Sequence, residues 1–246
     1  MKLRVINPNT TAEMTARIGA AACAVAAPGT HIDAVQPSFG APSIEGHHDE
    51  VWAAAGVAEQ VRAGEAAGAD AHVIACFGDP GLHGARELAR GPVIGIAEAA
   101  FHAASMLATG FSVVTTLTRT CVIAEHLVLQ YGFERRCRGI HGTDIAVLAL
   151  DDPASQAFER ILACAEQALQ RDRSGAIVLG CAGMADLCHA LQQRLGVPVV
   201  DGVAAAVKLA ESLVALGLLT SKRGDYAPPL PKRYAGLAAP FSPEGA

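Results

Sequence analysis

Short segments of this 246-residue chain recur in the same order further along the sequence. The clearest pair is AHVIACFG at residues 71–78 and AIVLGCAG at residues 176–183. Cys76 and Cys181 occupy the same place in the two copies, at a step of 105 residues. Two further pairs keep this order, GPVIG (91–95) with VPVVD (197–201) and, more loosely, LRVINPNT (3–10) with FSVVTTLT (111–118).

Three matches in register indicate two lobes of similar structure. Short apolar runs alternate with longer stretches rich in Ala, Leu and Glu, which is typical of parallel, doubly wound sheets buried on both faces. We therefore expect an α/β fold of two pseudo-symmetric lobes, each a mostly parallel four-stranded sheet flanked by helices, with the site in the cleft between them. The predicted strands cover residues 3–6, 73–75, 93–96, 112–115, 177–179 and 197–200.

The order of the repeated segments predicts where the chain crosses between the lobes. We expect residues 1–97 and 202–220 in the first lobe and residues 98–201 in the second. A last helix is expected over residues 209–219, ending at Gly217. Residues 221–246 form a Pro-rich C-terminal tail, because proline interrupts regular helix.

The composition excludes several function classes. A formal net charge of -5, with scattered Lys and Arg, gives no basic patch for nucleic acid. Apolar stretches are interrupted well before they reach the length of a membrane span, and the first residues lack the apolar core of a signal peptide. We therefore expect a cytoplasmic protein with neither nucleic acid nor membrane as a partner.

The seven cysteines do not form a disulfide framework, because their number is odd and their spacing wide. No Cys-x-x-Cys occurs, and the spacing of Cys181, Cys188 and His189 matches no structural zinc pattern, so no metal is expected. Five cysteines have no counterpart in the repeat and are interpreted as structural: Cys23, Cys121, Cys137, Cys164 and Cys188.

Cys76 and Cys181 each follow an apolar strand, and ligands of open α/β sheets bind at the carboxyl ends of strands. Two facing lobes would bring both thiols to one cleft, where helix N-termini are expected to lower their pKa. Inverting a carbon centre by proton transfer needs a base on one face and an acid on the other, and two equal thiols serve both directions. Backbone N–H groups around Gly78 and Gly183 are expected to stabilise the carbanion.

At these residues the chain resembles the aspartate/glutamate racemase superfamily, and within it the hydantoin racemase group. The resemblance extends over about residues 3 to 220, and the two cysteine motifs together are its specific part. It depends on NPNTT (7–11), ACFGDPG (75–81), VIGIAEA (93–99), VTT (114–116) and LGCAGM (179–184).

The resemblance implies racemisation of 5-substituted hydantoins without a cofactor, with Cys76 and Cys181 as the two acid/bases, a small-molecule substrate and a homo-oligomer. The alternatives are racemisation of allantoin by the same mechanism and an amino-acid racemase of the Asp/Glu type. Phe77 and Ala182, beside the cysteines, favour a neutral ring. The expected substrate-binding residues are Asn7, Asn9, Phe39, Ser43, Phe77, Gly78, Thr115, Thr116, Ala182 and Gly183.

Several of these side chains have a second interpretation. Asn7 and Asn9, like Thr10, either donate hydrogen bonds to the ring or form a turn and helix cap, and Thr115 and Thr116 leave the same choice. Asp79 is a helix cap or tunes Cys76, although a carboxylate raises a thiol pKa. The loop with Ser43, Ile44 and Glu45 is expected to close over the ligand, Glu98 lies either at the cleft or on the surface, and His47 and His48 are a solvated pair or metal ligands.

Two other classes of protein remain open at this point. A periplasmic-type binding protein also has two lobes and a cleft, but it needs export and has no use for paired cysteines. A cysteine hydrolase needs a base beside the thiol. The only histidines that closely follow either cysteine in sequence are His83 and His189.

Overall fold

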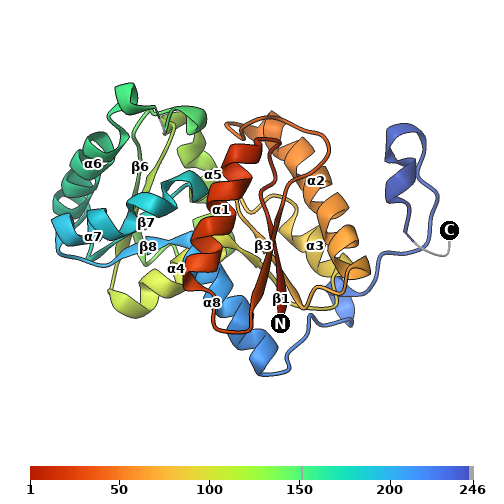
Figure 1. Cartoon of the computed structure of the whole chain (residues 1–246). Helices are drawn as coiled ribbons and strands as arrows, with labels where there is room; N and C mark the ends of the chain where they lie inside the picture. Colours follow the sequence, from red (N-terminus) through yellow and green to blue (C-terminus); the bar gives the residue numbers. More distant parts are fainter. Residues whose placement is uncertain (151, 244–246) are drawn as a thin grey trace.

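The computed structural model describes residues 1–150 and 152–243, in which two four-stranded sheets lie side by side (Figure 1). Every pair of neighbouring strands is parallel. The orders β2-β1-β3-β4 and β6-β5-β7-β8 are the same permutation. The predicted α/β fold of two similar lobes is thus confirmed. The first sheet contains β1 (Lys2–Ile6), β2 (His31–Val35), β3 (Ala71–Ile74) and β4 (Val93–Gly95), and the second β5 (Phe111–Thr115), β6 (Cys137–Gly142), β7 (Ala176–Leu179) and β8 (Val199–Asp201).

The strands β2 and β6 were not located by the sequence. Both are edge strands, and their residues are mostly half-exposed, with polar residues and glycine among them. The inner strands β3 and β7 are buried at every residue, because helices cover both faces of each sheet. The half-exposed strands β2 and β6 therefore lack the continuous apolar run that reveals a buried strand, whereas the buried edge strands β4 and β8 were located.

Helices cover both faces of each sheet. In the first lobe α1 and α8 contact each other on one side of the sheet, and α2 and α3 contact each other on the opposite side. In the second lobe α4 contacts α5, and α6 contacts α7. The helices are α1 (Ala12–Val25), α2 (His47–Ala66), α3 (Leu82–Leu88), α4 (Ile96–Leu107), α5 (Cys121–Gln130), α6 (Ala157–Asp172), α7 (Cys188–Leu195) and α8 (Gly202–Ala215).

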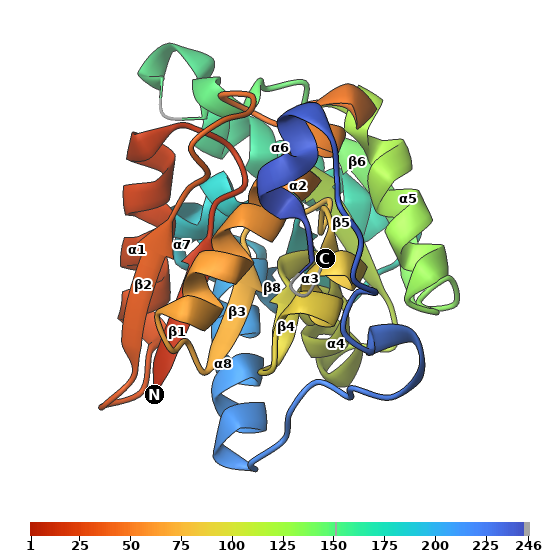
Figure 2. The same cartoon turned by 90° about the vertical axis from the view of Figure 1, so that its right-hand side faces the viewer.

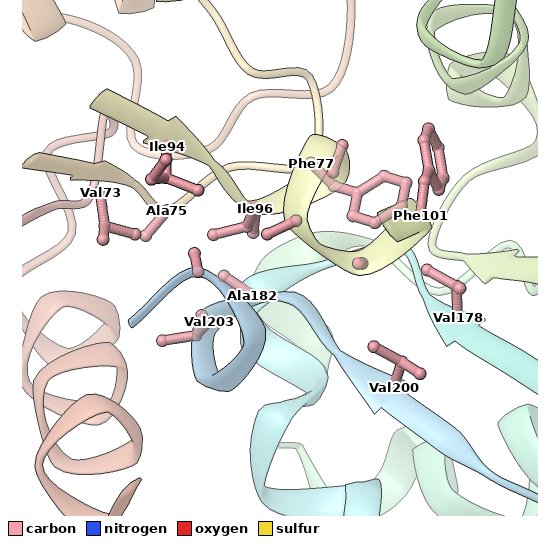
Figure 3. Packing of buried hydrophobic residues seen from close by; sticks show 14 of the residues in the cluster. Val73, Ala75, Phe77, Ile94, Ile96, Phe101, Val178, Ala182, Val200 and Val203 are labelled. Carbon is pink, nitrogen blue, oxygen red and sulfur yellow. The ribbon is translucent and has the colours of Figure 1, made fainter. Parts of the chain in front are cut away.

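The two lobes are joined through α4 and α8, which contact each other. The helix α4 packs on β7 and β8, whereas α8 returns to β3 and β4. One buried apolar cluster consequently extends across both sheets, and Figure 3 shows part of it between the first lobe and β7, β8 and α8. The predicted lobe boundaries stay a prediction. The last helix begins at Gly202 and not near residue 209, because the Asp201 side chain caps it.

The C-terminal tail runs over the outside of the first lobe (Figure 2). Its first part is fastened to α3, since the Lys222 ammonium donates to the carbonyl oxygens of Arg86 and Glu87. Further along, the ring of Phe241 meets that of Phe39 edge-on at 6.2 Å between centroids. No helix within residues 1–150 and 152–243 has the length and apolar character needed to cross a membrane.

Candidate active site

A cleft open to solvent lies where the carboxyl ends of strands from both sheets meet. The lobes contribute comparable segments, namely the residues that follow β1 and β3 in the first and β5 and β7 in the second. The lining residues are Asn7, Asn9, Met14, Ile44, Glu50, Ala75, Cys76, Phe77, Gly78, Thr115, Thr116, Thr120, Ile123, Ala124, Val147, Gly180, Cys181 and Ala182.

Cys76 and Cys181 both line this cleft, and both are free thiols that are partly buried. Each follows an inner strand, β3 or β7, at the same place in the repeat. Each thiol also accepts a hydrogen bond from the backbone N–H two residues further on, at Gly78 and Gly183 respectively. The two sites therefore match in backbone geometry as well as in sequence.

These two N–H groups point to the sulfur atoms. The sequence had assigned them to a carbonyl oxygen of the substrate. An N–H donor beside sulfur favours the thiolate, so each turn stabilises the ionised form of its own cysteine. The stabilisation of a substrate oxyanion then falls to other groups in the cleft.

The expectation that helix N-termini lower the thiol pKa values is wrong. Burial raises the pKa of Cys76 to about 12 and that of Cys181 to about 11, and the N–H donors only partly offset this effect. The helix α3 begins six positions after Cys76, at Leu82, and the segment after Cys181 is a 3-10 helix (Ala182–Leu187). Neither thiol lies directly at the N-terminus of an α-helix, where the dipole effect is confined.

The environments of the two thiols differ in charge. Negative charge on Cys181, Asp79 and Glu50 raises the pKa of Cys76 further. Near Cys181 the guanidinium of Arg17 acts in the opposite direction and lowers the pKa. Because the charge of Cys181 acts on the pKa of Cys76, the two thiols are close enough to interact.

Asn7 and Asn9 line the cleft and are buried, yet most of their hydrogen bonds hold the loop before α1. The Asn7 Nδ2 group donates to Asn9 Oδ1 at 2.8 Å and to the Thr15 hydroxyl at 2.9 Å. Asn9 Oδ1 also accepts from the Thr11 N–H at 2.9 Å. Asn9 Nδ2, however, has the Met14 thioether as its partner, and a thioether is a weak acceptor. This amide is free to donate to a substrate carbonyl.

In the second lobe Thr115 and Thr116 take the corresponding place in the cleft. The Thr115 hydroxyl donates to the Gly180 carbonyl at 2.8 Å and so ties β5 to the residue before Cys181. Phe77 and Ala182, beside the two cysteines, are apolar lining residues, as expected for a site that takes a neutral ring.

Three predicted binding residues lie outside the lining. Phe39 packs against the tail through Phe241, and Ser43 is half-buried away from the cleft wall. Gly183 touches the site only through its N–H bond to Cys181. Glu98 lies beside α3, where it pairs with Arg86 at 2.5 Å.

Several lining residues come from segments that the sequence did not connect with the site. Glu50 of α2 is the one charged side chain among the described lining residues. Thr120 ends the 3-10 turn Thr118–Thr120, and Ile123 and Ala124 lie in the first turn of α5. Across the mouth, the carboxylate of Glu45 accepts a hydrogen bond at 2.8 Å from the N–H of Val147. No motif marks Glu50 or the α5 residues, because elements distant in sequence bring them to the cleft, whereas Glu45 belongs to the loop that the sequence placed over the ligand.

Within the described parts of the chain, no three His, Cys, Asp or Glu side chains are grouped so that they could hold a metal ion. The imidazoles of His47 and His126 stack at 6.5 Å between centroids, and His47 contacts Glu50 at 3.1 Å. His47 thus belongs to a small polar cluster beside the cleft.

The chain belongs to the family of Asp/Glu/hydantoin racemases, whose profile matches residues 3–210. The resemblance predicted from the sequence is thereby confirmed, and the chain is an isomerase. A hydantoin racemase of Rhizobium meliloti is 50% identical over 236 residues, which cover 96% of this chain and 98% of that protein.

Solved structures agree with this assignment. An allantoin racemase from Klebsiella pneumoniae is 60% identical and superposes with a TM-score of 0.96, covering 99% of both chains. An allantoin racemase from Pseudomonas fluorescens is 45% identical with a TM-score of 0.93, covering 96% of this chain and 100% of the other.

Proposed function

We propose that this protein racemises 5-substituted hydantoins at ring C5 without a cofactor, with Cys76 and Cys181 as the two acid/bases. The observation that carries the proposal is the pair of thiols at equivalent strand ends of two similar sheets, lining one cleft. Inversion of a carbon centre needs this arrangement, a proton acceptor on one face and a donor on the other. A cytoplasmic location and a homo-oligomeric assembly, expected from the sequence, belong to the same proposal.

The reaction balances within the cleft. One cysteine, as thiolate, removes the proton from C5, and the electron pair of the C–H bond moves into the ring carbonyl to give an enolate. The other cysteine, as thiol, delivers its proton to the opposite face of C5. The two residues finish with exchanged protonation states, ready for the reverse direction. The Asn9 amide is the donor that we assign to the enolate oxygen.

A neutral ring fits the cleft better than a free amino acid. The carboxylate of an amino acid calls for a cationic partner, and the described lining contains no Lys, Arg or His. A hydantoin needs only acceptors for its N–H groups and donors for its carbonyls. The amino-acid racemase is therefore the weaker alternative.

Allantoin, which is a hydantoin with a ureido group on C5, is a second candidate substrate. The Glu50 carboxylate favours it, because it is an acceptor for N–H donors that an alkyl or aryl substituent lacks. The 60% identity to the Klebsiella pneumoniae allantoin racemase supports the same choice.

The experiment that tests the proposal follows the optical rotation of single enantiomers of allantoin and of 5-benzylhydantoin in D₂O, with EDTA present. Wild-type protein is compared with Cys76→Ser and Cys181→Ser. We expect racemisation with deuterium at C5 in the wild type and none above the buffer rate in either variant. No racemisation of either ring by the wild type, or full activity in both variants, would refute the proposal.

A further inference from the structure

The N-terminus of α4 is capped by a residue from another segment. The N-cap position, Gly95, has no side chain. The Asp79 carboxylate takes its place and accepts hydrogen bonds from the N–H groups of Ala97 at 3.1 Å and Glu98 at 3.0 Å. The hydroxyl of Tyr131 donates to the same carboxylate at 2.9 Å. Asp79 is 5% exposed, so its carboxylate is held by these three donors rather than by solvent.

The second lobe caps its equivalent helix differently. Asp201, which corresponds to Gly95 in the repeat, accepts from the N–H groups of Val203 and Ala204, at the same spacing of two and three residues. The position that corresponds to Asp79 is Met184. The equivalent cap is thus made by the N-cap residue itself at α8 and by a residue of the Cys76 turn at α4.

The space at Gly95 shows that a side chain at position 95 and the Asp79 carboxylate cannot both occupy the cap of α4. A Cβ atom on Gly95 would lie 2.2 to 2.4 Å from the carboxyl atoms of Asp79. The backbone of Gly95, with φ -81°, and that of Asp201, with φ -86°, are otherwise alike. Glycine at 95 therefore serves to admit the carboxylate of Asp79.

Asp79 also belongs to the turn that holds Cys76. Its N–H donates to the Cys76 carbonyl at 3.0 Å, and its φ of 44° lies in the left-handed region that costs a side chain strain. The neighbouring Phe77 ring meets Phe101 of α4 edge-on at 5.6 Å (Figure 3). Two residues of the Cys76 turn are accordingly fastened to α4, whereas the Cys181 turn has Ala182 and Met184 in their places.

We propose that Asp79 is the positioning residue of Cys76: by capping α4 from the Cys76 turn, it fixes that turn relative to the second lobe, on which α4 packs. The inference rests on the proposed function, in which Cys76 exchanges a proton with C5 of the substrate in the cleft. A proton transfer tolerates little displacement, and an error of about 1 Å costs on the order of a hundredfold in rate. Cys181 has no such tie, so the two thiols are held by different means.

The variant that tests this exchanges the two residues, Asp79→Gly with Gly95→Asp. Glycine accepts the left-handed backbone at 79, and Asp at 95 caps α4 as Asp201 caps α8. The exchange keeps the helix cap and the composition but removes the tie to the Cys76 turn. Asp201→Gly is the matched control, because it removes the buried cap of α8 and leaves the Cys76 turn intact.

The first measurement is the exchange of the C5 proton of each enantiomer with D₂O. The enantiomer that depends on Cys76 is the one whose exchange is lost in Cys76→Ser. In the variant with Asp79→Gly and Gly95→Asp, we expect the proton-exchange rate of the enantiomer that depends on Cys76 to fall about tenfold to a hundredfold. The rate of the other enantiomer should stay within about twofold, and the melting temperature should be close to that of the wild type. Asp201→Gly should lower the melting temperature without this bias.

The second measurement does not depend on racemisation. The alkylation rate of Cys76 by iodoacetamide, followed by peptide mass spectrometry, should change about threefold or more in the exchange variant while that of Cys181 stays constant. An equal change at both thiols, no change at Cys76, or an equal fall for both enantiomers would overturn the role of Asp79. A wild type that racemises neither ring would instead refute the proposed function, and the alkylation rates would still show whether the exchange acts on Cys76 alone.

Discussion

At the scale of single residues, the two thiols are equivalent in backbone geometry and different in electrostatics. Burial raises both pKa values, to about 12 for Cys76 and about 11 for Cys181, and the carboxylates of Asp79 and Glu50 add to the shift of Cys76. The carboxylates around Cys76 therefore oppose its ionisation, whereas Arg17 favours that of Cys181. The free enzyme at neutral pH holds two thiols, and only a small fraction has the one thiolate that the reaction needs.

This difference predicts the pH dependence of the rate. Since both pKa values are raised, the thiolate fraction grows with pH, and we expect kcat/KM for racemisation to rise about tenfold per pH unit between about pH 7 and pH 9. The measurement is the initial rate at constant ionic strength, with Cys76→Ser protein as the blank for spontaneous racemisation. A plateau already below about pH 8 would contradict the raised pKa values.

Glu50 provides a prediction about selectivity. Loss of its charge in Glu50→Gln should lower kcat/KM for allantoin about tenfold relative to 5-benzylhydantoin, because a hydrogen bond to a charged acceptor is worth about 1.5–3 kcal/mol. The same change should lower the pKa of Cys76, since the Glu50 charge raises it. Glu59→Gln, a carboxylate that binds Ser38 outside the cleft, is the control. Equal losses for both substrates would remove Glu50 as a selectivity residue.

At the scale of helices and strands, the elements that could be located from the sequence are the repeated segments and the buried strands. The inner strands β3 and β7 are unbroken apolar runs, and their repeat placed Cys76 and Cys181 correctly at the cleft. The edge strands β2 and β6 were missed because half-exposed strands show no such run. Contacts such as those of Glu50 and Asp79 depend on helices far apart in sequence, which no single motif encodes. The thiol pKa values were misjudged because burial is not visible in a motif.

The loop before α2 is tied to the second lobe across the mouth of the cleft by Glu45 and the N–H of Val147. Glu45→Ala removes this bond, and we expect the KM for substrate to rise about threefold to tenfold with a smaller change in kcat. Glu45→Gln removes the charge but keeps an acceptor for the N–H, so its KM should stay near that of the wild type. A rise of the same size in both variants would mean that charge and not the bond is responsible.

At the scale of the whole molecule, the lobes share one core. Residues of both sheets, such as Val73 and Val178, belong to a single buried cluster, and α4 and α8 contact each other between the sheets. The cleft is therefore formed by two lobes that pack on one shared cluster. A fixed distance between Cys76 and Cys181 depends on this shared core, as the two thiols have no covalent link.

A shared core predicts one cooperative unfolding transition. Ile161 of α6 is fully buried in a cluster made only of second-lobe residues, and Ile161→Ala should cost about 2–5 kcal/mol. Fluorescence of Trp52, the chain's single tryptophan, reports on α2 in the first lobe, and alkylation of Cys164, followed by mass spectrometry, reports on α6. We expect both probes to give the same denaturant midpoint, and Ile161→Ala to shift the two equally. A Trp52 midpoint that stays at its wild-type value while that of Cys164 falls would show that the lobes unfold independently, and that the two thiols are aligned by something other than the shared core.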